Sequence, residues 1–110
     1  MSGSLPSGIL VSALLKRVND AGGMGMVRAK GDADSGAILL ILDEGGGSSQ
    51  LVERAIGPLG KPALVATGPS DPSGHEAYWR RRRARDPDLW VIELDIPSAE
   101  RFAAETILDG

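Results

Sequence analysis

Five arginines close together in the chain are the residues best able to bind an anion. They are Arg80, Arg81, Arg82, Arg83 and Arg85. Guanidinium groups bind phosphates and carboxylates through paired hydrogen bonds. On a helix, successive residues point around the axis at intervals of about 100°, so four in a row cannot form one patch. We therefore expect a solvated helix end, where arginines pair with nearby carboxylates such as Glu76 and complement the helix dipole.

Two further groups could support chemistry. His75 is the only histidine, and therefore the only side chain whose ordinary pKa suits acid–base catalysis near neutral pH. Asp32 and Asp34 lie close together in Gly31-Asp32-Ala33-Asp34-Ser35-Gly36. A hydrolase or transferase built on His75 and this aspartate pair is one hypothesis, although no residue stands at a spacing diagnostic of a catalytic triad.

The aspartate pair does not predict a metal site. A calcium loop that began at Asp32 would need a ligand at its fifth position and a glutamate at its twelfth, where this chain has Gly36 and Asp43. We expect a turn in which the Asp side chains bond their own backbone. The chain has no Cys, which excludes disulfides, zinc–thiolate sites and iron–sulfur clusters. No cofactor is predicted.

Hydrophobic periodicity predicts two main helices. Apolar residues form a broad stripe from Ile9 to Asp20, with Ser7 as the expected N-cap and Gly22-Gly23 as the stop. A second helix is expected to begin at Asp71-Pro72 or at a capping box, Ser73 to Glu76, and to end near Arg85, before Pro87. A short terminal helix over 99–107 is also expected.

The strands follow from apolar runs. We predict strands over 24–30, 37–42, 62–67 and 89–96, whereas residues 50–56 fit either a strand or a short helix. The first two are expected to form a hairpin around the turn at 31–36. The run at 37–42 does not alternate, so it should be a central strand covered on both faces. The predicted fold is α+β, with a mainly antiparallel four- or five-stranded sheet and two main helices.

Length and charge limit the organisation and the partners. A chain of 110 residues predicts one domain over 1–110, with a flexible N-terminus (1–6) and a flexible Gly-rich loop (43–49). A net charge of −3 opposes attraction to nucleic acid, which stays a weaker alternative partner. No secretory n-region precedes the first helix, and no apolar run is long enough to cross a membrane. We expect a cytoplasmic protein that does not bind membranes.

Aromatic side chains suggest an interface. Only 4% of residues are aromatic, yet Tyr78 and Trp79 are neighbours. Adjacent residues cannot share one helix face, so one of the two should be exposed or lie at an interface. Candidate interface residues are Tyr78, Trp79 and Trp90. A protein partner is predicted, and a second copy of the chain is our hypothesis for it.

Three segments resemble a known family. They are Leu5-Pro6-Ser7-Gly8 with Lys16-Arg17, then Arg28 with Gly31-Asp32-Ala33-Asp34-Ser35-Gly36, and Asp86-Pro87-Asp88-Leu89-Trp90-Val91-Ile92-Glu93. Together they resemble the uncharacterised bacterial domain-of-unknown-function family 1491. The resemblance implies no activity and assigns no catalytic residue.

We rank three hypotheses for function. A non-enzymatic binding or protein-interaction module comes first, because the catalytic inventory is thin. Anion or nucleic-acid binding through the Arg-rich helix end comes second, and the enzyme using His75 comes third. The candidate polar or anion site comprises Arg28, Asp32, Asp34, Arg82, Arg83 and Arg85.

Overall fold

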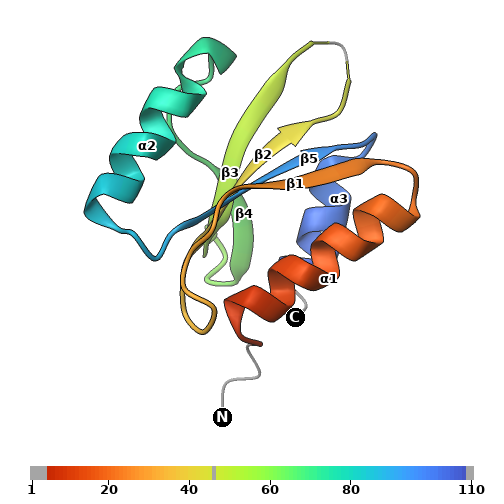
Figure 1. Ribbon diagram of the computed structural model, residues 1–110, viewed down its shortest axis with the longest axis horizontal. Helices are drawn as coiled ribbons and strands as arrows, with labels where there is room; N and C mark the ends of the chain where they lie inside the picture. Colours follow the sequence, from red (N-terminus) through yellow and green to blue (C-terminus); the bar gives the residue numbers. More distant parts are fainter. Residues whose placement is uncertain (1–4, 46, 109–110) are drawn as a thin grey trace.

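The computed structural model describes residues 5–45 and 47–108. In chain order, its elements are α1 (Ser7–Asp20), β1 (Met24–Ala29), β2 (Ile38–Asp43), β3 (Ser49–Ile56), β4 (Pro62–Ala66), the 3₁₀ turn η1 (Pro72–Gly74), α2 (His75–Arg85), β5 (Trp90–Asp95), α3 (Ala99–Ala103) and the π-helical turn η2 (Ala104–Leu108). Figure 1 shows one sheet with α1 and α3 on one side and α2 on the other.

The five strands form one mixed sheet in the order β1-β5-β2-β3-β4. Three of its four pairings are antiparallel, and β2 with β5 is parallel. The predicted α+β fold with a mainly antiparallel sheet and two main helices is therefore confirmed. The central position predicted for residues 37–42 is also confirmed, and residues 50–56 belong to a strand.

The predicted hairpin between the first two strands is wrong. β1 pairs with β5, and β5 lies between β1 and β2. Residues 31–36 instead cross the start of β5: the Asp32 N–H donates to the Asp88 carbonyl at 3.0 Å, and the Trp90 Nε1–H donates to the Asp32 carbonyl at 2.7 Å. β5 is apolar on both faces at its start, so it gains more burial at the centre of the sheet than at its edge.

Two hydrophobic clusters lie on opposite faces of the sheet. Side chains of α1 and α3 pack against Leu40, Ile92, Leu94 and their neighbours on one face. Trp79 of α2 packs against Leu39, Leu51, Val91 and their neighbours on the other. The strand predicted over 89–96 is confirmed as β5, and its alternate residues Trp90, Ile92, Leu94 and Ile96 all belong to the α1 side.

The helix ends differ from the prediction at one point. Asp71 caps the turn before α2 by accepting the Ser73 N–H at 3.0 Å, and α2 ends at Arg85, before Pro87. Ser7, however, does not cap α1. It is the first helical residue, and its Oγ donates to the Gly36 carbonyl at 2.5 Å. The predicted flexible N-terminus lies outside the described residues except for Leu5 and Pro6, as does Gly46 of the Gly-rich loop.

Candidate functional site

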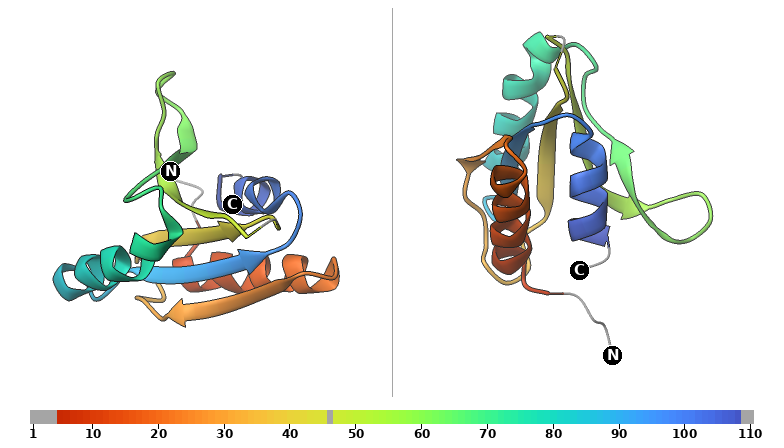
Figure 2. Two further views of the ribbon diagram at one scale, coloured as in Figure 1. Left: turned by 90° about the horizontal axis from the view of Figure 1, so that it is seen from above. Right: turned by 90° about the vertical axis from the view of Figure 1, so that its right-hand side faces the viewer.

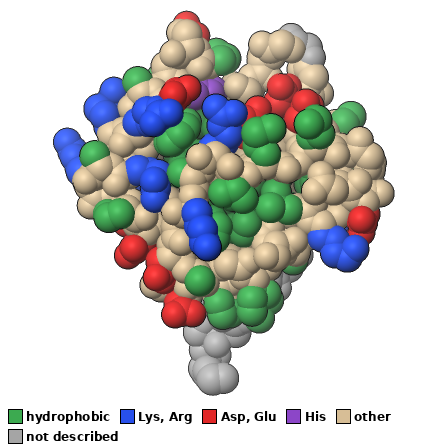
Figure 3. All heavy atoms as spheres, in the orientation of Figure 1, with side chains coloured by type: hydrophobic (Ala, Val, Ile, Leu, Met, Phe, Trp, Pro, Cys, Tyr) green, Lys and Arg blue, Asp and Glu red, His purple; other side chains and the backbone are tan. Residues whose placement is uncertain are grey.

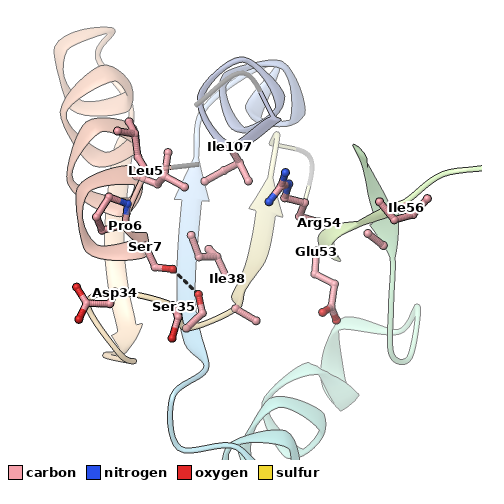
Figure 4. Close-up of a pocket in the computed structure, with 14 residues that line it drawn as sticks. Leu5, Pro6, Ser7, Asp34, Ser35, Ile38, Glu53, Arg54, Ile56 and Ile107 are labelled. Carbon is pink, nitrogen blue, oxygen red and sulfur yellow. Dashed lines mark hydrogen bonds between the residues drawn. The ribbon is translucent and has the colours of Figure 1, made fainter. Parts of the chain in front are cut away.

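An open groove of about 630 Å³ lies between the start of α1 and the end of β3. Figure 4 shows Leu5, Pro6 and Ser7 on one side of it, Glu53, Arg54 and Ile56 on the other, and Ile38 and Ile107 between them. These residues come from four parts of the chain. The groove, defined by this lining, is the principal candidate for a binding site.

The groove forms where β2 and β3 separate. Their pairing ends at Leu39 and Glu53, while β3 continues to Ile56, paired only with β4. Beyond that point, the side of Arg54–Ile56 that would face β2 has no ladder partner among the described residues. Backbone amide and carbonyl groups in this position can pair with an added strand.

The other wall is the first turn of α1. The Ser7 N–H donates to the Asp34 carbonyl at 3.2 Å and the Gly8 N–H to the Ala33 carbonyl at 2.8 Å. Free N–H groups at a helix start need such acceptors. Together with the Ser7 hydroxyl bond to Gly36, they fix α1 to the turn at 31–36. The wall is therefore held by hydrogen bonds rather than by packing alone.

Exposed apolar side chains stand at both sides of the groove. On the side of α1, Leu5 is 47% exposed and nearby Ile9 is 53% exposed. On the other side, Ile56 is 71% exposed and Leu59, in the turn that follows, is 85% exposed. Figure 2 shows this β3–β4 turn extending away from the rest of the molecule in both views. Apolar side chains gathered around a hollow are typical of binding surfaces.

The turn at 31–36 has a structural role in this fold. The Asp32 carboxylate accepts the backbone N–H groups of Asp34 and Ser35 at 3.0 and 2.9 Å. These hydrogen bonds from Ser35 and Asp34 lower the pKa of Asp32. Asp34 is exposed and lines the groove. Within residues 5–45 and 47–108, no three His, Asp or Glu side chains are grouped to hold a metal ion.

The candidate arginines lie in different parts of the structure and have different partners. Arg28 pairs with Glu93 at 3.4 Å on the β1 side of the sheet. Arg83 donates to three backbone carbonyls, those of Lys30, Pro87 and Leu89. Arg82 and Arg85, by contrast, line the same small hollow. The structure therefore brings together only part of the predicted polar set.

Arg82 is held by an ion pair. Its guanidinium donates to both Glu53 carboxylate oxygens, at 2.6 and 3.2 Å, and to the Tyr78 hydroxyl at 3.1 Å. The hydrogen bonds to Glu53 raise the pKa of Arg82 further above its ordinary value. Since Glu53 belongs to β3, this pair ties α2 to the strand that forms one wall of the groove.

The candidate interface aromatics are mostly buried in this chain. Trp79 and Trp90 are each 5% exposed and belong to the two core clusters. Tyr78 is half-buried, and its hydroxyl lies 2.8 Å from Thr67 Oγ1. Contacts within a single chain therefore explain why these three aromatic side chains are buried or half-buried.

His75 is buried at the start of α2. Its Nδ1 lies 3.4 Å from Ser49 Oγ, and its Nε2 has no hydrogen-bond partner among the described residues. A triad needs one ring nitrogen on the nucleophile and the other on an orienting carboxylate. Here the second nitrogen meets no carboxylate, and His75 lines neither the groove nor the hollow beside Arg82.

Sequence reasoning missed the groove. Its apolar residues Leu5, Ile38, Ile56 and Ile107 belong to segments that are distant in the sequence. One local signal was present. The end of β3 and the turn after it read Ile56-Gly57-Pro58-Leu59, which places two large apolar side chains where polar residues facing solvent are expected.

Among the described residues, no helix is both long and apolar enough to cross a membrane.

Comparisons with known proteins agree with the resemblance noted in the sequence. The family model described as protein of unknown function (DUF1491) matches residues 5–104. A search of curated proteins found no match. One similar solved structure is a crystal structure of a DUF1491 family protein from Caulobacter crescentus CB15. It is 30% identical, covers 90% of this chain and 94% of its own, and has a TM-score of 0.77.

Two further similar structures were determined in solution. An NMR structure of a DUF1491 family protein from the same organism is 30% identical, covers 89% of this chain and 91% of its own, and has a TM-score of 0.73. The solution structure of protein Atu0922 from A. tumefaciens is 27% identical, covers 94% and 92%, and has a TM-score of 0.71. The matched family model and these shared folds show that the chain belongs to the DUF1491 family, whose function is unknown.

Proposed function

We propose that this protein is a non-enzymatic protein-interaction module, and that its groove binds an extended apolar segment of a partner protein. The observation that carries the proposal is that one side of Arg54–Ile56 has no ladder partner among the described residues and lies beside a largely apolar cavity of about 630 Å³. An added strand would pair with this backbone, and its alternate side chains would enter the cavity.

The charges at the groove define the segment further. Glu53 is already paired with Arg82, whereas Arg54 is exposed and makes no ion pair among the described residues. A segment that enters the groove would therefore gain from a carboxylate opposite Arg54. The proposed ligand is an extended apolar segment that carries one acidic residue.

The test is selection of random linear dodecapeptides on the wild-type protein, followed by affinity measurements on two variants. Ile56→Glu places a charge at the groove, and Met24→Glu makes the same kind of change on exposed β1, at the opposite edge of the sheet. The lost burial of Ile56 corresponds to at least about a tenfold weaker affinity. Met24→Glu should bind like the wild type.

Two results would contradict the proposal. One is selected peptides that bind Ile56→Glu as tightly as the wild type. The other is a selection in which no peptide is enriched. Sedimentation at high micromolar concentration tests a second copy as the occupant: a wild-type dimer that Ile56→Glu makes monomeric would replace the partner segment by a second copy of this chain.

The enzyme hypothesis has less support. His75 is buried away from both hollows, and the only hydrogen-bond partner of its side chain in the described chain is Ser49. A general base must reach the proton it removes from a substrate. No second candidate function is therefore proposed for His75.

A further inference from the structure

The arginines of α2 differ in whether their guanidinium groups have partners within the chain. Arg80 pairs with Glu76 at 2.7 Å, and Arg82 with Glu53 at 2.6 Å. Arg83 is occupied by three backbone carbonyls. Arg81 and Arg85 make no hydrogen bond or ion pair within residues 5–45 and 47–108, and both are exposed.

The two unused arginines lie on the same face of the helix. Residues four apart are neighbours on a helix surface, and like charges in this relation destabilise it. Arg81 and Arg85 line one hollow of about 310 Å³, together with Arg82, Tyr78 and Asp86. Figure 3 shows Lys and Arg side chains gathered over α2. The fold therefore keeps two unpaired guanidinium groups side by side in a hollow.

We propose that this hollow binds the phosphate group of a small molecule. Two guanidinium groups can donate several hydrogen bonds to a tetrahedral oxyanion, and each can do so in a paired fashion. Arg82 is held by Glu53 and Tyr78, so it forms a fixed wall of the hollow, and Glu53 already balances its charge. This site lies on α2 and is independent of the groove proposed above.

A small ligand fits better than a nucleic acid. A hollow of about 310 Å³ is at the lower end of small-molecule sites. Binding to a phosphate polymer requires several contacts along a basic strip, whereas the chain has a net charge of −3 and α2 offers two free arginines.

The experiment is NMR titration of the amide signals of α2 with inorganic phosphate and with pyrophosphate, in a phosphate-free buffer. We expect saturable shifts near Arg81, Arg85 and Asp86. The double variant Arg81→Gln/Arg85→Gln should bind at least tenfold more weakly. The matched control is Arg80→Gln, which removes one charge from the same helix outside the hollow and should bind within twofold of the wild type.

A further variant tests whether removal of a negative charge at the hollow strengthens phosphate binding. Asp86→Asn keeps a side-chain oxygen that can accept the Asp88 N–H, a bond of 3.2 Å in the wild type, but removes the negative charge. We expect about threefold tighter phosphate binding from the lost repulsion. Because Arg81 and Arg85 are exposed, the variants should keep the wild-type circular dichroism spectrum.

Three results would overturn the site. The first is no saturation below about 20 mM phosphate, since a specific site should bind at roughly millimolar concentration. The second is an equal loss in Arg80→Gln, which would indicate diffuse charge attraction. The third is a single-stranded oligonucleotide that binds α2 far more tightly than pyrophosphate with a steep salt dependence, which would assign the arginines to nucleic acid.

Discussion

Replacing Gly36 by alanine should destabilise the protein by disrupting the contact between the turn at 31–36 and Asp88, just before β5. A Cβ at Gly36 would lie 2.1 Å from the Asp88 carbonyl oxygen, and one at Gly31 would lie at the same distance from the same atom. Real Cβ atoms do not approach below 3.0 Å, so the Asp88 carbonyl must move by nearly 1 Å. This carbonyl is backbone, and no rotamer change can relieve the clash.

The cost follows from what moves with Asp88. Its carbonyl accepts the Asp32 N–H at 3.0 Å, and this bond contributes about 1 kcal/mol. Leu89 and Trp90 follow directly and are 0% and 5% exposed, so their displacement adds a repacking cost of about 1–3 kcal/mol. We expect Gly36→Ala to lower the free energy of unfolding by roughly 3 kcal/mol.

The assay is equilibrium unfolding in urea at 25 °C, with Gly22→Ala as the control. Gly22 has a φ of +91°, but no atom of the described residues lies within 4 Å of the added Cβ. Its replacement should therefore cost only the backbone strain, about 1 kcal/mol. If Gly36→Ala and Gly22→Ala lose the same free energy of unfolding, the tight approach to Asp88 has no energetic weight and the reasoning is refuted.

Three other changes test separate features. Arg83→Met removes the donors to three carbonyls and should cost about 1–3 kcal/mol in urea unfolding. Arg80→Met removes an exposed ion pair and a cation–π contact with Trp79, and should cost about 1 kcal/mol or less, so equal losses would contradict the role of Arg83. The pKa of Asp32 is lowered in the folded state, so its contribution is present at neutral pH and is lost as the pH falls below its ordinary value. The stability difference between wild type and Asp32→Asn should therefore shrink from pH 7 towards acid pH, and a difference independent of pH would contradict this. Ser98 has a φ of 59° and no side-chain capping bond, so Ser98→Gly should raise the unfolding free energy by about 0.5–1 kcal/mol; a loss in thermal or urea unfolding would refute the strain.

Local patterns predicted the elements but not all of their partners. The apolar stripe of α1 and the alternation in β5 are visible in short windows of sequence because side-chain direction repeats with each element's geometry. A Gly- and Asp-rich segment between two strands also predicts a hairpin locally. That prediction failed at residues 31–36 because β5, about 60 residues later, takes the place beside β2.

The candidate sites too were predictable only where they depend on neighbouring residues in the sequence. Four successive arginines cannot share a face, and the structure indeed gives Arg80, Arg82 and Arg83 different partners. Which of them stay unpaired depends on Glu53 and on the carbonyls of residues 30, 87 and 89, which no spacing within α2 reveals. The groove depends on where the β2–β3 pairing ends, and strand periodicity continues through that point unchanged.

The position of β5 also constrains how the molecule can assemble. Its neighbours β1 and β2 lie some 50 or more residues earlier in the chain, and they have no pairing with each other. Until residues 90–95 are available, β1 lacks the strand with which it pairs in the folded sheet. Pairing between such distant segments is slow because the intervening loop must close first. During synthesis, β1 therefore stays unpaired until β5 has been made. We expect the partly synthesised chain to be most prone to misassociation during this interval.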